Sequence, residues 1–227
     1  MSGKNHDEVD SEGPWFSGAA LDGRTAAPVS GREIELPDEA MEASTVLVVE
    51  SGGTQAEGVC RAFYPEGRLD EASLLIMSLA GGAGDRINAV RSSDLPFPRN
   101  LTVISTEDRF GTVRTETGAD GTGRDVAVRT VKDPSDLPKL GMSITSVVEE
   151  WSEEEILICF DSLSQLLRTV DPERVYRFVR VLEDRLGGLD ARIHFHVSGE
   201  ACDDRTLSTL QSLFDTVVDV PTDLESS

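Results

Sequence analysis

Short apolar runs alternate with amphipathic stretches along this chain from residue 45 onwards. Each apolar run has the length and composition of a buried strand, and each amphipathic stretch has the periodicity of a helix. The expected strands are Thr45–Val49, Ser73–Leu79, Leu101–Ser105, Val126–Val131, Ile156–Phe160, Ile193–Val197 and Thr216–Val220. The expected helices are Gln55–Phe63, Asp85–Arg91, Leu137–Trp151, Ser162–Arg168, Asp171–Leu186 and Asp203–Phe214. Strands separated by helices predict a three-layer α/β domain with a mainly parallel central sheet.

The helix Asp171–Leu186 carries the clearest start and stop signals. Asp171 stands at the expected N-cap, Pro172 at the first helical position, and Gly187 follows the last turn. In contrast, Gly111–Arg124 is rich in Gly, Thr and Asp and predicts a loop. Residues 1–40 are polar and rich in Gly and Ser, so we expect a flexible acidic N-terminal tail, an α/β domain over residues 41–221 and a short C-terminal tail over 222–227.

The charged residues of the chain predict a strongly acidic surface. The formal net charge is −21, and only three of the 21 basic residues are lysine. An acidic surface with few lysines and few aromatic residues is typical of proteins from extreme halophiles, which are adapted to molar salt. Such a surface argues against direct binding of nucleic acid. The chain has no apolar run of the roughly 20 residues that a membrane helix needs, and its three cysteines form no pair motif, so we expect a cytoplasmic protein with reduced thiols.

The strongest candidate for chemistry is the strand that ends on Asp161 and Ser162. A buried parallel strand delivers such a carboxylate to the carboxyl edge of the sheet, where open α/β folds bind nucleotides. Asp161 is then a candidate ligand for Mg²⁺. The alternative is structural, because Asp and Ser also cap helices and a helix is expected from Ser162 onwards.

The order of elements resembles the RecA/KaiC-like branch of P-loop ATPases, and most closely a haloarchaeal family of degenerate KaiC-like proteins of unknown function. The resemblance rests on the strand Thr45–Val49 leading into a glycine loop, on Ile156–Leu167 as the Walker B strand with its following helix, and on the closing segment Leu213–Asp219. It implies that Gly52, Gly53, Gly58, Asp161 and Ser162 would contact a nucleotide, if one is still bound.

Two departures from the family pattern argue against ATP hydrolysis. A working phosphate loop places Lys and Ser/Thr after its last glycine, whereas Val59 and Cys60 follow Gly58 here. The resemblance also implies a pair of glutamates after the second strand to activate water, but the chain has Leu79–Asp85, which contains no glutamate. We therefore expect no catalytic residues and no resident cofactor, with residual ATP and Mg²⁺ binding as the open alternative.

Three further candidate sites also have a purely structural explanation. His194 and His196 lie two apart on one strand and share a face, so they are candidate metal ligands with Cys202 or Asp161 as a third, or simply paired polar positions. Gly81–Gly84 follows a strand and predicts a tight turn or an anion site. Cys60 at a helix start is expected to be a buried structural cysteine.

These observations predict a catalytically inactive RecA/KaiC-like module that acts through protein–protein contacts in regulation or signalling. Its partner would be a KaiC-like ATPase or a second copy of this chain. One alternative is a nucleotide-binding protein with slow or no ATP hydrolysis. Another is a regulator that acts at DNA through a partner, without contacting nucleic acid directly.

Overall fold

The computed structural model describes residues 36–51, 56–64, 68–106, 114–117, 125–151 and 155–220. All of them belong to one compact unit, Arg32–Ser227. Residues 1–35 of the predicted N-terminal tail, residue 221 and the predicted C-terminal tail over 222–227 lie outside the described residues. Within the described residues, no helix is long and apolar enough to cross a membrane.

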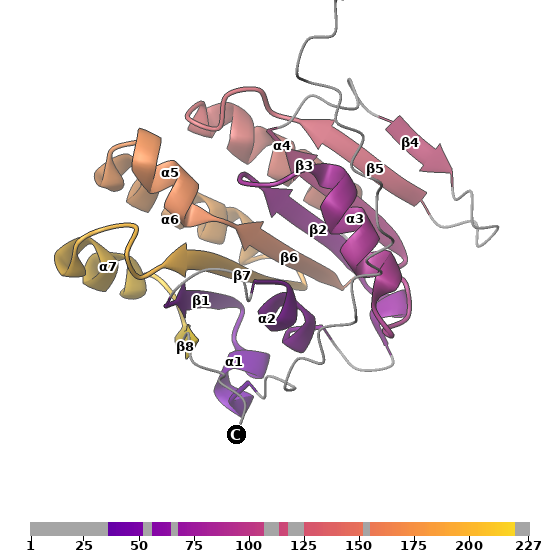
Figure 1. Ribbon diagram of the computed structural model, residues 1–227, viewed down its shortest axis with the longest axis horizontal. Helices are drawn as coiled ribbons and strands as arrows, with labels where there is room; N and C mark the ends of the chain where they lie inside the picture. Colours follow the sequence, from indigo (N-terminus) through magenta and orange to yellow (C-terminus); the bar gives the residue numbers. More distant parts are fainter. Residues whose placement is uncertain are drawn as a thin grey trace, which may run out of the picture. The chain divides into compact units, whose positions relative to one another are not determined.

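An eight-stranded sheet forms the centre of this unit (Figure 1). Its strands are β1 (Thr45–Glu50), β2 (Ser73–Ser78), β3 (Asn100–Ser105), β4 (Arg114–Thr117), β5 (Asp125–Thr130), β6 (Ile156–Asp161), β7 (Ala191–Ser198) and β8 (Thr216–Val220). Their spatial order is β4-β5-β3-β2-β6-β7-β1-β8. Every pairing is parallel except the one between β4 and β5. Seven strands therefore end at one carboxyl edge, with β6 and β7 near the middle.

Helices cover both faces of the sheet and give it three layers. The helices are α1 (Asp38–Glu42), α2 (Ala56–Ala62), α3 (Ala83–Ser92), α4 (Leu137–Glu150), α5 (Leu163–Thr169), α6 (Pro172–Leu186) and α7 (Asp204–Gln211). Residues of α4, α5 and α6 join the large core on one face, which includes Phe160 and Phe195. Residues of α1, α2 and α3 pack on the opposite face, where α3 crosses in front of β2 and β3 in Figure 1. The predicted three-layer α/β fold with a mainly parallel sheet is confirmed, and it is RecA-like in architecture.

The capping residues predicted for α6 are confirmed. The Asp171 carboxylate accepts a hydrogen bond from the Glu173 backbone N–H at 2.9 Å, and Pro172 is the first helical residue. The helix ends at Leu186, and the N–H of the C-cap residue Gly187 donates to the Glu183 carbonyl. Its apolar stripe is buried against the sheet, so local chemistry and tertiary packing agree along this segment.

Two local elements differ from the sequence prediction. β4 lies inside the segment predicted as a loop and pairs with β5. The sequence did not predict this strand because Arg-Thr-Glu-Thr has no apolar residue, and it becomes a strand only by pairing at the edge of the sheet. Helix α1 begins at Asp38, three residues inside the predicted tail, and Ala40 is buried against Val46 and Val48. Burial of one short apolar face stabilises a segment that composition alone placed outside the domain.

Candidate functional site

Asp161 ends β6 at the carboxyl edge of the sheet, next to β2 on one side and β7 on the other. Its carboxylate forms an ion pair with the guanidinium of Arg86 from α3, and the two side chains are only 11% and 16% exposed. The same guanidinium donates a long hydrogen bond of 3.5 Å to the Ser78 hydroxyl at the end of β2. A cation supplied by the protein therefore already faces the carboxylate that was the candidate Mg²⁺ ligand.

The predicted helix cap at Asp161 is wrong. Helix α5 begins at Leu163, and its N-cap is Ser162, whose side chain makes no capping hydrogen bond. Asp161 itself is the last residue of β6, and the peptide bond that joins it to Ser162 is cis. The carboxylate is directed to Arg86, an ion pair that sequence spacing could not indicate because 75 residues separate the two positions.

The predicted phosphate loop is only partly described. Gly52 and Gly53 lie outside the described residues, and Gly58 is exposed within α2. Val59, at the position that would carry lysine, is fully buried and packs in the small core with Val46, Val48 and Phe63. The position after the last glycine therefore contributes to the hydrophobic core of this face rather than presenting a side chain to a ligand.

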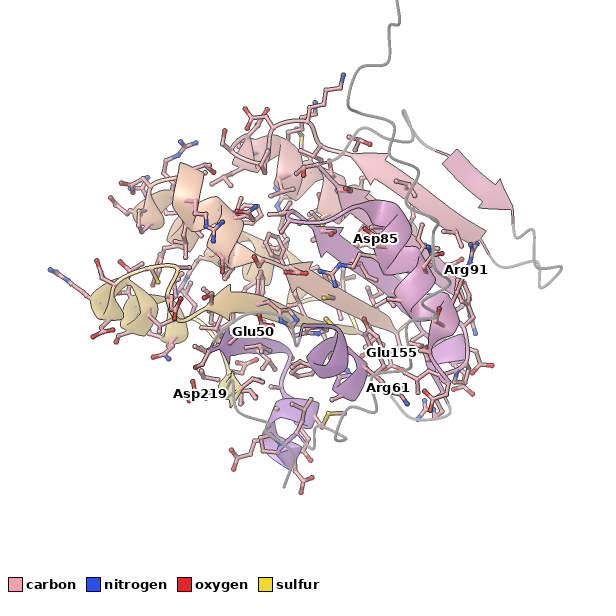
Figure 2. All side chains as sticks on the ribbon, in the orientation of Figure 1. Glu50, Arg61, Asp85, Arg91, Glu155 and Asp219 are labelled. Carbon is pink, nitrogen blue, oxygen red and sulfur yellow. The ribbon has the colours of Figure 1, made fainter. Side chains whose placement is uncertain are left out.

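The glycine segment after β2 forms a turn into α3. The Gly81 carbonyl accepts hydrogen bonds from the Ser78 hydroxyl at 3.0 Å and from the Ser105 hydroxyl at 3.3 Å. Gly82 is the N-cap of α3, without a side chain to complete the cap. Asp85, which lies on α3 in Figure 2, is the first carboxylate after β2 and it is exposed. No glutamate follows β2 in this segment to activate a water molecule.

Four buried side chains meet beneath α2, further from the carboxyl edge of the sheet than Asp161. Cys159 on β6 is the register neighbour of His194 on β7, and both point to the face covered by α2. His196 lies two residues further along β7 on the same face. Cys60 reaches the group from α2, and one donor atom from each of the four residues lies within 4.8 Å of all the others.

Hydrogen bonds link these side chains. The Sγ atoms of Cys60 and Cys159 are 2.9 Å apart, and Cys60 Sγ is 3.2 Å from Nε2 of His196. On its other side, His196 contacts Oε1 of Glu50 through Nδ1 at 2.7 Å. Glu50 extends from the carboxyl end of β1 (Figure 2). Because a carboxylate accepts hydrogen bonds, Nδ1 of His196 is assigned as the donor in this contact.

Burial and mutual contacts displace the pKa values of the four clustered side chains. The hydrogen bond from Cys60 lowers the pKa of the Cys159 thiol well below its usual range despite burial, whereas the same contact and burial raise the pKa of Cys60. Burial alone lowers the pKa of His196, but its contacts with Cys159 and Glu50 outweigh burial and raise that pKa to about 9. Burial lowers the pKa of His194. The contacts within the cluster therefore act on three of these four pKa values as strongly as burial does.

The sequence identified half of this cluster. His194 and His196 were paired by strand spacing, but the suggested third ligands, Cys202 and Asp161, are not part of the group. Cys202 is half-buried in the segment before α7, and Asp161 faces Arg86. One usable signal was overlooked: Cys159 lies two residues before Asp161 and must share its face of the sheet. Cys60 had no comparable signal, because its placement depends on how α2 packs.

Comparison with known proteins places the chain in a family. The model for a family of unknown function, DUF7504, matches residues 43–220. The chain belongs to the DUF7504 family. No curated protein matches the sequence. The match covers β1 to β8, so both Asp161 and the four-residue cluster lie in the part that defines DUF7504 proteins.

A solved structure supports the fold of this DUF7504 protein. The chain is similar to a protein of Pyrococcus horikoshii OT3 from a structural study, with a TM-score of 0.51 at 14% identity. The match covers 79% of this chain and 82% of that one. At this level of identity the likeness concerns the fold alone.

Proposed function

We propose that this DUF7504 protein is a RecA/KaiC-like module that has lost ATP hydrolysis and acts by binding other proteins, in regulation or signalling. The observation that carries the proposal is the ion pair between Arg86 and Asp161. In a working P-loop ATPase the carboxylate at the end of this strand holds Mg²⁺. Here a guanidinium from α3 neutralises it, so a magnesium ion would have to displace a buried, paired cation.

Two more features support loss of hydrolysis. Val59 replaces the lysine that would reach the phosphates, and it is packed in the core. In the turn after β2, the Gly81 carbonyl accepts hydrogen bonds from the hydroxyls of Ser78 and Ser105. The segment Leu79–Asp85 contains no glutamate to activate water. Each change removes a different part of phosphoryl transfer: the grip on the phosphates, the metal and the base.

The acidic charge extends the proposal to the setting in which the module works. A net charge of −21 on 227 residues, with three lysines, supports a protein adapted to molar salt. Relatives with intact ATPase sites would be its natural binding partners, because RecA-like domains share the surfaces by which they assemble. This part of the proposal rests on analogy of fold.

Thermal unfolding in molar KCl with and without Mg-ATP tests the proposal. We expect no shift in Tm at millimolar Mg-ATP and no phosphate release, because a ligand that does not bind the native state cannot stabilise it. The Tm of Asp161→Ala should likewise be the same with and without Mg-ATP. An upward shift with ATP that disappears in Asp161→Ala would instead establish a nucleotide-binding protein.

The partner half of the proposal needs a separate measurement. An intact KaiC-like ATPase should change its rate of phosphate release when this protein is added in stoichiometric amount. The control is the same protein after thermal unfolding. An unchanged rate, together with separate elution of the two proteins in size-exclusion chromatography, would overturn partnership with such an ATPase.

A further inference from the structure

We propose that Cys60, Cys159, His194 and His196 form a structural zinc site that fixes α2 to the centre of the sheet. The inference does not depend on the proposed function, because it concerns a different set of residues. All four side chains are buried, with relative exposures between 0% and 6%. Two cysteine sulfurs and two imidazole nitrogens are the donor set of many structural zinc sites, and here the chain supplies all four.

The spacing of the donor atoms suits one ion. Tetrahedral zinc, with bonds of about 2.3 Å to sulfur and about 2.0–2.1 Å to nitrogen, requires neighbouring ligand atoms roughly 3.3–3.8 Å apart. The two sulfurs are 2.9 Å apart, Cys60 Sγ lies 3.2 Å from His196 Nε2, and no donor pair exceeds 4.8 Å. The first two distances are shorter than the required range by less than about 1 Å, and the third is an upper limit on the remaining pairs. The four donors are therefore close enough together to surround one ion after small side-chain shifts.

The histidines are prepared for metal ligation. Glu50 accepts the Nδ1 proton of His196 at 2.7 Å, which directs the Nε2 atom of the same ring toward Cys60, where it would bind the ion in place of a proton. A carboxylate that orients a ligating histidine in this way is the usual outer partner in zinc sites. His194 provides an independent sign, because its Nε2 is fully buried and has no hydrogen-bond partner among the described residues. A buried polar atom without a partner is costly, and a metal bond would satisfy it.

The surroundings indicate a closed site rather than a catalytic one. The Phe63 ring stacks on His194 with the ring centroids 4.4 Å apart and the planes 9° from parallel. Tyr64 lies against the same imidazole and is also buried. All four zinc positions are taken by protein atoms, so no position remains for water or substrate.

The donor set also selects the metal. Thiolate and imidazole ligands in a tetrahedral arrangement favour zinc over magnesium or calcium, which prefer oxygen. Two thiolates balance the charge of Zn²⁺, so the loaded site would be neutral in the core. The ion would join β6, β7 and α2, three elements that are distant in sequence, and it would stabilise the fold by binding the native chain only.

The test is the metal content of the full chain purified under reducing conditions in molar KCl and then desalted. We expect one zinc per chain by elemental analysis, and cobalt added after chelator treatment should give the visible bands of tetrahedral Co²⁺ with a thiolate charge-transfer band. Zinc removal should lower Tm, and zinc addition should restore it. Cys60→Ser should reduce the zinc content, whereas Cys202→Ser, which changes the cysteine outside the cluster, should keep one zinc per chain.

Three results would overturn the proposal. The first is wild-type protein that is folded, metal-free and unchanged in Tm by added zinc. The second is equal zinc retention in Cys60→Ser and Cys202→Ser, which would place the metal on the acidic surface. The third is a disulfide between Cys60 and Cys159 that persists in the folded protein after purification under reducing conditions. If Cys60→Ser does not fold, the wild-type chain supplies the test. Its Tm should fall when zinc is removed and recover when zinc is added, and added cobalt should give the tetrahedral spectrum.

Discussion

Arg86 and Asp161 form an ion pair between the first turns of α3 and the last residue of β6, with both side chains largely removed from solvent. Removal of one partner leaves a poorly hydrated charge behind, which is far more costly than the loss of an exposed ion pair. The pair also occupies the position where a related ATPase would hold its metal ion. It is therefore the contact on which both stability and the absence of hydrolysis are best tested.

The single substitutions Arg86→Met and Asp161→Asn should each destabilise the protein by about 2–4 kcal/mol. The double variant should lose clearly less than the sum, with a coupling free energy above about 1 kcal/mol. Thermal unfolding in molar KCl measures all four proteins. The matched control is the exposed pair Arg177 and Glu173 on α6, whose coupling should stay below about 0.5 kcal/mol. Additive effects at Arg86 and Asp161 would show that the ion pair contributes little.

Glu50→Gln should weaken zinc binding by about 10- to 100-fold while the stoichiometry at saturation stays at one ion per chain. The amide side chain keeps the size of Glu50 but cannot hold the Nδ1 proton of His196 as a carboxylate does. Competition with a chromogenic zinc chelator gives the affinity. Glu39→Gln, an exposed position on α1, is the control and should leave the affinity unchanged. Equal affinities for wild type and Glu50→Gln would remove Glu50 from the site.

Stability should fall as pH rises from about 4.5 to about 7, in part because of Glu183. Burial, together with the charge of Asp215, raises the pKa of Glu183 from 4.5 to about 7. Its Oε1 atom is buried without a hydrogen-bond partner among the described residues. The folded state therefore binds the proton more tightly than the unfolded chain, and this contribution is lost as the folded carboxyl ionises.

Glu183→Gln should accordingly stabilise the protein at pH 8, on the order of 1 kcal/mol after allowance for solvent screening of a half-buried group. At pH 4 the two proteins should differ much less. Thermal unfolding at both pH values in constant KCl gives the comparison. Glu149→Gln on α4, which is exposed, should show no such pH dependence. A gain from Glu183→Gln that is equal at both pH values would contradict the prediction.

Tm should rise steeply between 0.1 M and about 2 M KCl. A chain with a net charge of −21 repels itself at low salt, and the screening length falls from about 10 Å at 0.1 M to about 3 Å at 1 M. Sucrose at matched osmolality should raise Tm less, because it does not screen charge. A Tm that is flat in KCl from 0.1 M upwards would argue against adaptation to high salt.

The sequence alone determined the order and type of most elements. Buried strands such as Ile156–Asp161 are apolar along their whole length, and α6 carries its own cap at Asp171, so both are specified by neighbouring residues. β4 is the counter-example: its polar residues become a strand only by pairing with β5. The same holds for α1, which depends on burial of Ala40.

The sites were decided by the tertiary structure. His194 and His196 share a face because a strand repeats every two residues, which the sequence reveals. Cys60 and Cys159 are 99 positions apart, and their sulfurs meet only because the tertiary structure packs α2 over β6. Arg86 reaches Asp161 for the same reason, since β2 and β6 are neighbours in the sheet but distant in the chain. Local periodicity fixes which way a side chain points, whereas its partners depend on the order of strands in the sheet.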